Sequence, residues 1–345
     1  MKRLIIIVAV VLVALAVIFL QTQGDKQTAG SLAERVEESG TLTVAIASEI
    51  EIVPIAQLRE GFRQEMQLYS GSSGVEIEYT EYNAAGDKAL IAQIADAIAT
   101  NPPDVIYVLG TSQAQAIQKR APAILMVQGA VTDPVSAKLA ESWDRSGVPY
   151  IATSDMPPIP RQIALIRTLT PHVRNLGVVY NPGETNSVAV IDRLKAKLKQ
   201  GSAELMLHER AVTNTADVAQ SVESLLGHVE AIYLPPDNTI YGAIKVIGKE
   251  AKDNSIPLYA TTKPALEEGA LATMALNFTE LGRDSAKLLR QVLEQGADPA
   301  AMPIITNRNP TVYVNGERLK KLGLSRDAIR EWHNVEIWRP QSKGS

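Results

Sequence analysis

Five short polar segments, each directly after an apolar run, hold the side chains through which this chain could act chemically. The segments are 110–113, 131–134, 181–187, 235–239 and 260–263. Their hydroxyl, amide and carboxylate groups donate and accept hydrogen bonds, and together they suit holding a small polar molecule rather than breaking one.

Thr111 and Ser112 stand at the beginning of a predicted helix, Gln113 to Lys119. A Thr or Ser in this position caps a helix by accepting a backbone N–H bond. The free N–H groups and the dipole at a helix start also favour an anion such as a carboxylate. Capping is routine and needs no ligand, so this segment alone leaves both interpretations open.

Asp133 and Asp237 follow strands of two different units and could flank an ammonium group. They could also be helix caps, or an acid/base pair of the kind that hydrolyses glycosides. The sequence shows no nucleophile-elbow pattern or metal cluster beside them, which favours binding over catalysis. Asn186 and Ser187 begin another helix, and their segment lacks the glycine patterns of phosphate and dinucleotide loops.

The composition excludes several classes of function. A net charge of −4 with no basic block argues against a nucleic-acid partner. The chain has no cysteine, which excludes disulfides, thiolate metal sites, a cysteine nucleophile and a lipid-modified cysteine. The four histidines are far apart in the sequence, and we expect neither a metal site nor a cofactor.

The N-terminus has a different character from the rest of the chain. Met1 to Arg3 is a short basic start, and Leu4 to Leu20 is an unbroken apolar run. Residues 1–24 are therefore predicted to be a signal peptide or an N-terminal membrane anchor, with a tether at 25–40. No small-x-small cleavage site follows Leu20, which favours the anchor. With the basic start inside, the rest of the chain is expected outside the cytoplasm.

The apolar runs before the polar segments are short and continuous, as in buried parallel strands. Amphipathic helices separate them, for example Ile55 to Tyr69, and a seam lies near 150–155. We predict an α/β protein with two lobes and a C-terminal tail: 41–152 with about 278–298, 153–277 with about 299–330, and 331–345. Ligands of such sheets bind outside the carboxyl ends of the strands, where the polar segments lie.

Five sequence motifs resemble those of the exported substrate-binding proteins of ABC importers, in the family that includes the tryptophan-binding type. The motifs are Asn83–Asp87, Gly129–Val135, Tyr180–Ser187, Pro236–Thr239 and Gly269–Thr273, within a match over roughly Leu42 to Leu324. The resemblance implies a type I periplasmic-binding fold, in which two Rossmann-like lobes with parallel sheets close around a ligand cleft. It also implies a monomer without enzyme activity, an amino-acid-like ligand that is often aromatic in characterised relatives, and an ABC permease as partner.

The resemblance assigns roles to the polar segments as well. Thr111 and Ser112 are carried over as carboxylate binders and Asp237 as the partner of the ammonium group. The further wall residues are Thr132, Asp133, Asn186, Ser187 and Asn238. At 49–54 the chain departs from the Glu-His-Pro-like stretch that is usual near the family's first strand, which bears on ligand identity. The three tryptophans lie outside the motifs, so the ligand is not expected to stack on tryptophan.

The expected location is the periplasm or the extracytoplasmic face of the membrane, with the chain either anchored or secreted. The alternative function is a membrane-anchored ligand-sensing ectodomain that signals through a partner, because sensing and import can use the same cleft. An exported hydrolase would need a nucleophile and a base that the sequence does not show. A transcription regulator of the same fold would need a helix-turn-helix before the first lobe.

Overall fold

The computed structural model describes residues 32–200, 205–306 and 309–340. The predicted signal peptide or anchor and residues 25–31 of the predicted tether lie outside these residues. Within them, none of the helices combines the length and the apolar character that crossing a membrane requires. Residues 32–39 are helical and lead directly into the first strand.

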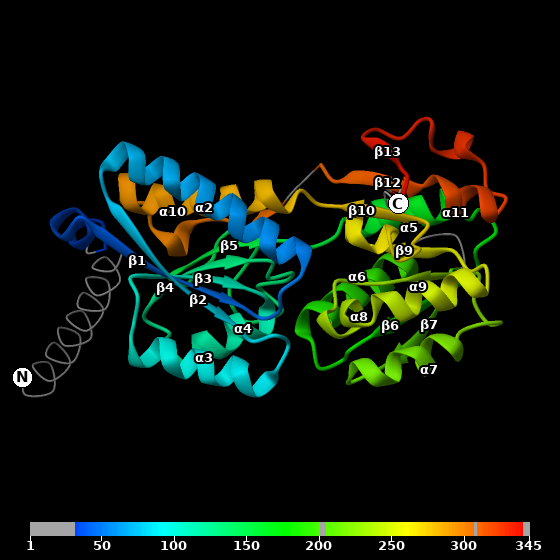
Figure 1. The fold of residues 1–345 in the computed structure, drawn as a ribbon, viewed down its shortest axis with the longest axis horizontal. Helices are drawn as coiled ribbons and strands as arrows, with labels where there is room; N and C mark the ends of the chain where they lie inside the picture. Colours follow the sequence, from blue (N-terminus) through cyan, green and yellow to red (C-terminus); the bar gives the residue numbers. More distant parts are fainter. Residues whose placement is uncertain (1–31, 201–204, 307–308, 341–345) are drawn as a thin grey trace, which may run out of the picture.

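The first lobe is built on a six-stranded sheet in which every neighbouring pair is parallel (Figure 1). Its strands, in spatial order, are β11 (Ile305–Thr306), β5 (Tyr150–Ser154), β4 (Leu125–Gly129), β3 (Val105–Leu109), β1 (Thr41–Ser48) and β2 (Glu76–Asn83). Strand β3 is buried at every position, which explains its continuous apolar sequence, since helices cover both faces of the sheet.

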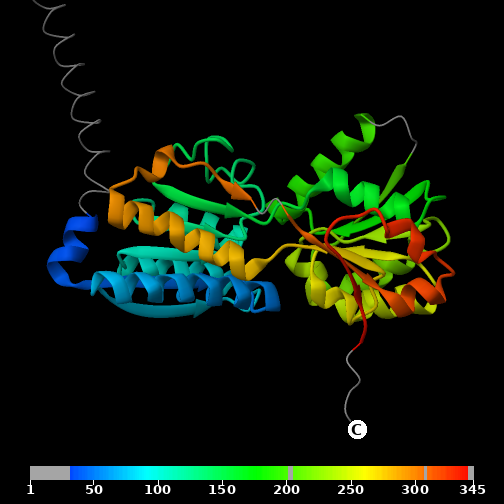
Figure 2. The ribbon, with the colours of Figure 1, turned by 90° about the horizontal axis from the view of Figure 1, so that it is seen from above.

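Two helices pack on each face of this sheet. Helices α2 (Val53–Ser73) and α10 (Phe278–Gln295) lie side by side over one face, as Figures 1 and 2 show. Helices α3 (Lys88–Thr100) and α4 (Thr111–Arg120) cover the other face. Helix α10 comes from late in the chain, so the first lobe is built from two segments that are far apart in the sequence.

Glycines let α2 and α10 approach closely. A Cβ atom on Gly61 would lie 1.9 Å from the carbonyl oxygen of Thr279, and one on Gly282 would lie 2.1 Å from that of Leu58. Both contacts are with backbone, which cannot rotate away, so the two helices would have to separate.

We therefore expect Gly282→Ala to lower the free energy of unfolding by about 1–3 kcal/mol, the usual cost of overpacking. Urea denaturation monitored by circular dichroism measures this. Gly71→Ala is the matched control, because Gly71 lies in the partner helix α2 and an added Cβ there would meet nothing within 4 Å. The control should be neutral or slightly stabilising, because alanine is the better helix former. Equal effects of the two changes would contradict the role given to the close approach.

The second lobe is built on a seven-stranded sheet. Its strands, in spatial order, are β13 (Val335–Trp338), β12 (Thr311–Asn315), β10 (Ala272–Ala275), β9 (Leu258–Ala260), β8 (Ala231–Tyr233), β6 (Asn175–Tyr180) and β7 (Met206–Ala211). Neighbouring pairs are parallel except β10 with β12, which is antiparallel. The α-helices of this lobe are α5 (Ile159–Leu169), α6 (Thr185–Gln200), α7 (Val218–Glu223), α8 (Asn238–Gly242), α9 (Ile244–Asp253) and α11 (Gly316–Lys321).

Short 3-10 helices complete the description: η1 (Thr215–Asp217), η2 (Lys263–Leu266) and η4 (Arg326–Ile329) in the second lobe, and η3 (Pro299–Ala301) beside the first. The prediction of an α/β protein with two lobes and mainly parallel sheets is confirmed. Each lobe has its own apolar clusters on the two faces of its sheet.

The chain passes between the lobes three times, after β5, after β10 and after β11. The last passage falls later than the predicted lobe boundary. Strand β11 pairs with β5 of the first lobe, and the N–H of Ser146 donates to the carbonyl of Met302 at 2.9 Å. Residues 299–306 therefore lie with the first lobe, where the sequence analysis had placed them in the second. Likewise β13, within the predicted C-terminal tail, pairs with β12 and extends the second sheet.

Candidate functional site

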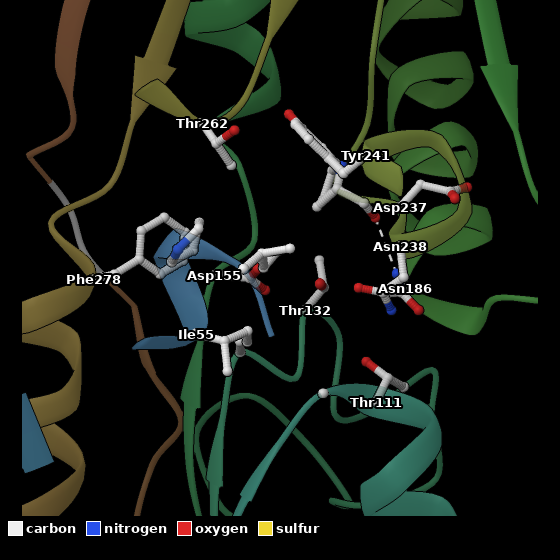
Figure 3. A pocket seen from close by; sticks show the side chains of 15 residues that line it. Ile55, Thr111, Thr132, Asp155, Asn186, Asp237, Asn238, Tyr241, Thr262 and Phe278 are labelled. Carbon is white, nitrogen blue, oxygen red and sulfur yellow. Dashed lines mark hydrogen bonds between the residues drawn. The ribbon is translucent and has the colours of Figure 1, made fainter. Parts of the chain in front are cut away.

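A pocket lies between the two lobes, at the carboxyl ends of strands from both sheets (Figure 3). Gly110 follows β3, Asp155 follows β5, Pro236 follows β8 and Thr262 follows β9. The lining residues are Ile52, Pro54, Ile55, Gly110, Thr111, Ala130, Thr132, Asp155, Asn186, Pro236, Asp237, Asn238, Tyr241, Thr262 and Phe278. The space not filled by atoms, including the open mouth, is about 490 Å³.

Three buried polar atoms in this lining have no hydrogen-bond partner within the described chain. They are the hydroxyl oxygen of Thr111 and the Oδ1 atoms of Asp155 and Asn186. Buried polar groups are nearly always paired, and an unpaired one costs about 1–3 kcal/mol. Three of them around one pocket, contributed by the first lobe, the second lobe and the segment between, indicate a place for a polar ligand.

Asp155 lies in the middle of the labelled side chains in Figure 3, on the segment where the chain leaves β5 for the second lobe. Burial raises the pKa of its carboxyl, and hydrogen bonding with Thr132 opposes that rise. A carboxylate that is buried and incompletely paired is the group expected to hold a cation such as an ammonium. Asp155 is not among the site residues predicted from the sequence. Its position directly after the strand at the predicted seam was the available signal.

Helix α4 already holds an anion at its start. The backbone N–H of Ser112 donates to Oε2 of Glu49 at 3.0 Å. Gly110, with φ of +113°, makes room for this carboxylate, because a Cβ there would lie 2.7 Å from Glu49 Oε2. Burial raises the pKa of Glu49, and the negative charge of Glu184 raises it further. The backbone N–H of Ser112, a predicted carboxylate binder, is thus already paired with a carboxylate of the chain itself.

Asp237 caps helix α8 and also accepts a hydrogen bond from the loop that follows β6. Its Oδ1 accepts the N–H of Ile240 at 3.0 Å, and its Oδ2 accepts the N–H of Asn181 at 2.6 Å. Glu184 adds a second carboxylate at the same helix start by accepting the N–H of Asn238 at 2.8 Å. Burial, together with the charge of Glu184, raises the pKa of Asp237 to about 7. Asp237 lines the pocket, but both its oxygens have backbone partners.

Asp133 faces the opposite lobe instead of the pocket. Its Oδ1 accepts the N–H of Ser136 at 3.0 Å, and its Oδ2 pairs with the guanidinium of Arg193 at 2.7 Å. Of the eight residues selected from the sequence, the pocket lining includes Thr111, Thr132, Asn186, Asp237 and Asn238. It does not include Ser112, Asp133 or Ser187, although all three lie on segments that reach the pocket.

Part of the lining is apolar or aromatic, and its members were not among the residues predicted from the sequence. Phe278 and Ile55 lie to one side of Asp155 in Figure 3, and Tyr241 lies across the pocket from them. The hydroxyl groups of Tyr241 and Thr261 are 2.8 Å apart, which fixes the tyrosine ring. Phe278 and Ile55 lie in the first turns of α10 and α2, helices that pack on the first sheet, where an apolar side chain is expected to face the core.

Residues 32–200, 205–306 and 309–340 contain no group of three or more acidic or histidine side chains placed to hold a metal ion.

The fold and the pocket define a two-lobed binding protein of the type I periplasmic architecture. The family model for ABC transporter substrate binding proteins matches residues 43–329, and the chain belongs to this family.

Known relatives span nearly the whole chain. The Tyrosine-binding protein of Clostridioides difficile (strain R20291) is 28% identical over 305 residues, which cover 88% of each chain. The crystal structure of an ABC domain in complex with L-Trp from Streptococcus pneumonia superposes with a TM-score of 0.79 at 24% identity, covering 86% of this chain and all of that one. The ligand-free, open structure of a substrate binding protein with adhesive properties from Clostridium difficile gives 0.67 at 27% identity, covering 87% and 100%.

Proposed function

We propose that this protein is the extracytoplasmic receptor of an ABC importer and that it binds an aromatic amino acid, such as tyrosine or tryptophan, in the pocket between its lobes. The observation that carries this proposal is the combination of three unpartnered polar atoms with an apolar wall in one pocket. An amino acid supplies matching polar groups at one end, and an aromatic side chain supplies an apolar body at the other.

The arrangement supports one orientation of the ligand. The ammonium group lies at Asp155 and donates a hydrogen bond to its free Oδ1. The carboxylate lies toward Thr111, whose hydroxyl has no other partner. The side chain packs between Phe278, Ile55 and Tyr241. Asn186, Asn238 and Asp237 close the site from the second lobe, as further wall residues.

The relatives support the same class of ligand. The curated relative is named for tyrosine, and one structural neighbour was solved with L-Trp. Delivery to a membrane permease rests on the family, whose members are substrate-binding proteins of ABC transporters. The apolar segment Leu4 to Leu20 supports a place outside the cytoplasm, at the membrane surface.

A thermal-shift screen of the chain from Ala29 onward tests the ligand. L-tyrosine or L-tryptophan at a hundredfold excess over its Kd should stabilise the folded state by ~2.7 kcal/mol, which raises Tm by roughly 5 °C. Glutamate, lysine and glucose serve as controls for size and charge. N-acetyl-L-tyrosine lacks the ammonium group and should give no shift.

Stabilisation by a sugar, or by the acetylated compound as strongly as by the free amino acid, would reject the proposed ligand. Uptake of labelled amino acid by cells with and without this chain tests import, and unchanged uptake would leave only a binding role.

A further inference from the structure

Arg193 joins the two lobes at a place outside the pocket lining. It lies on α6 of the second lobe, and its guanidinium pairs with Asp133 of the first lobe at 2.7 Å. The same guanidinium carbon lies 4.8 Å from the ring centre of Trp143, also of the first lobe. A planar guanidinium that is paired at its edge and stacked on its face has a defined position on the opposite lobe.

On the first lobe, the position of the Asp133 side chain does not depend on Arg193. Asp133 is held by the N–H of Ser136, and its side chain is only 4% exposed. Arg193 is 42% exposed, so it is the half of the pair that can move away into water when the lobes separate. The contact exists only when the lobes are close together, and its energy therefore favours that arrangement.

Helix α6 connects this contact to the pocket. Asn186, which lines the pocket, lies seven residues before Arg193 on the same helix. Seven residues are about two helical turns, so both side chains lie on the face of α6 that meets the first lobe. A second link across the lobes is the amide of Asn238, which donates to Glu49 at 3.1 Å.

We propose that Arg193 is a positioning residue for ligand binding: by pairing with Asp133 and stacking on Trp143 it holds α6, and with it Asn186, against the first lobe. It raises affinity through the closed arrangement without touching the ligand. This inference rests on the proposed function only for the choice of ligand, because the contact itself is made within the chain.

The test compares Arg193→Gln with Lys195→Gln. Lys195 is two residues along the same helix and pairs with Glu209 at 2.7 Å, but both of these residues belong to the second lobe. The full chain in detergent micelles is used. Because the chain has no cysteine, spin labels can be placed at Lys119→Cys on α4 and Lys197→Cys on α6, both exposed, to measure the distance between the lobes.

Without ligand, Arg193→Gln should raise the ratio of the open population, with the longer label distance, to the closed population by about tenfold. It should weaken binding of L-tyrosine by a similar factor. Lys195→Gln should change neither quantity. Arg193→Lys keeps the charge but loses the planar group that stacks on Trp143. Its open population and its affinity should lie between those of the wild type and Arg193→Gln. High salt should weaken ligand binding by the wild type more than ligand binding by Arg193→Gln, because salt screens the Arg193–Asp133 pair.

Trp143→Leu is the second variant should Arg193→Gln fail to fold, and it should also favour the open population. Unchanged distances in both Arg193→Gln and Trp143→Leu would overturn the proposal, as would equal shifts in Arg193→Gln and Lys195→Gln. Failure of L-tyrosine and L-tryptophan to bind the wild type would reject the proposed ligand, while the ligand-free distances would still decide the role of Arg193.

Discussion

Replacing Asp155 by asparagine is expected to weaken binding of the aromatic amino acid by about a hundredfold or more. The change keeps the size of the side chain but removes the charge that faces the ligand's ammonium group. Removing one partner of a buried, hydrogen-bonded charge pair costs about 3–5 kcal/mol, because the remaining charge is left uncompensated. Isothermal titration calorimetry measures the effect directly.

The affinity for the N-acetylated ligand gives the internal control for this experiment. In the wild type, acetylation should remove nearly all affinity, because it removes the ammonium group. In Asp155→Asn the free and acetylated ligands should bind almost equally weakly, since the partner of the ammonium is gone. A variant that still prefers the free amino acid by the wild-type factor would show that another residue, with Asp237 the first candidate, holds the ammonium group.

Replacing Asp237 by alanine is expected to act mainly on stability. It removes a helix cap, worth about 1 kcal/mol, and it leaves the buried N–H of Asn181 without its acceptor, worth about 1–3 kcal/mol more. The free energy of unfolding should therefore fall by about 2–4 kcal/mol, while affinity for the ligand falls less than in Asp155→Asn. Urea titrations and calorimetry on the same preparations separate the two effects.

The stability of the wild type should also depend on pH through Asp237. Its pKa rises from 3.8 to about 7 on folding, so the folded state holds the proton more tightly than the unfolded state in this interval. Stability is then greatest below the unfolded pKa, falls as pH rises through the interval, and levels off above about 7.

Asp237→Asn cannot titrate and should lose this part of the pH dependence. The comparison is made by urea denaturation at several pH values between 4 and 8. Identical pH profiles for the wild type and Asp237→Asn would show that other carboxyl groups, such as Glu49, dominate the dependence.

The sequence predicted the two lobes and the edge of the sheets where the pocket lies, because both depend on local patterns. Apolar runs of strand length, such as the one that forms β3, need no distant partner to be recognised. The polar segments after these runs follow from the geometry of parallel sheets. Lobe boundaries that depend on pairing between distant strands could not be predicted as well. Strand β11, for example, has only two residues, which are too few to show a pattern.

The roles of individual carboxylates could not be predicted in the same way. Asp133, Asp155 and Asp237 all follow strands, and nothing in their neighbours distinguishes them. What separates them is the partner that each meets in the folded chain. Asp237 meets the N–H of Asn181, 56 residues away, and Asp133 meets Arg193, 60 residues away. A side chain's function here depends on which donors other loops bring to it, and sequence spacing does not encode that.

The position of Asp155 between the lobes has a consequence for the kinetics of binding. Asp155 and Phe278 both lie where the chain passes from one lobe to the other, near the axis about which the lobes would rotate. Points near a hinge axis move least, so in the proposed site these two side chains would be in place before closure and would stay there as opening begins. Asn186 and Asn238, by contrast, belong to the second lobe and would meet the proposed ligand only when that lobe is closed. The segment between the lobes would then govern capture of the ligand, and the second lobe its residence time.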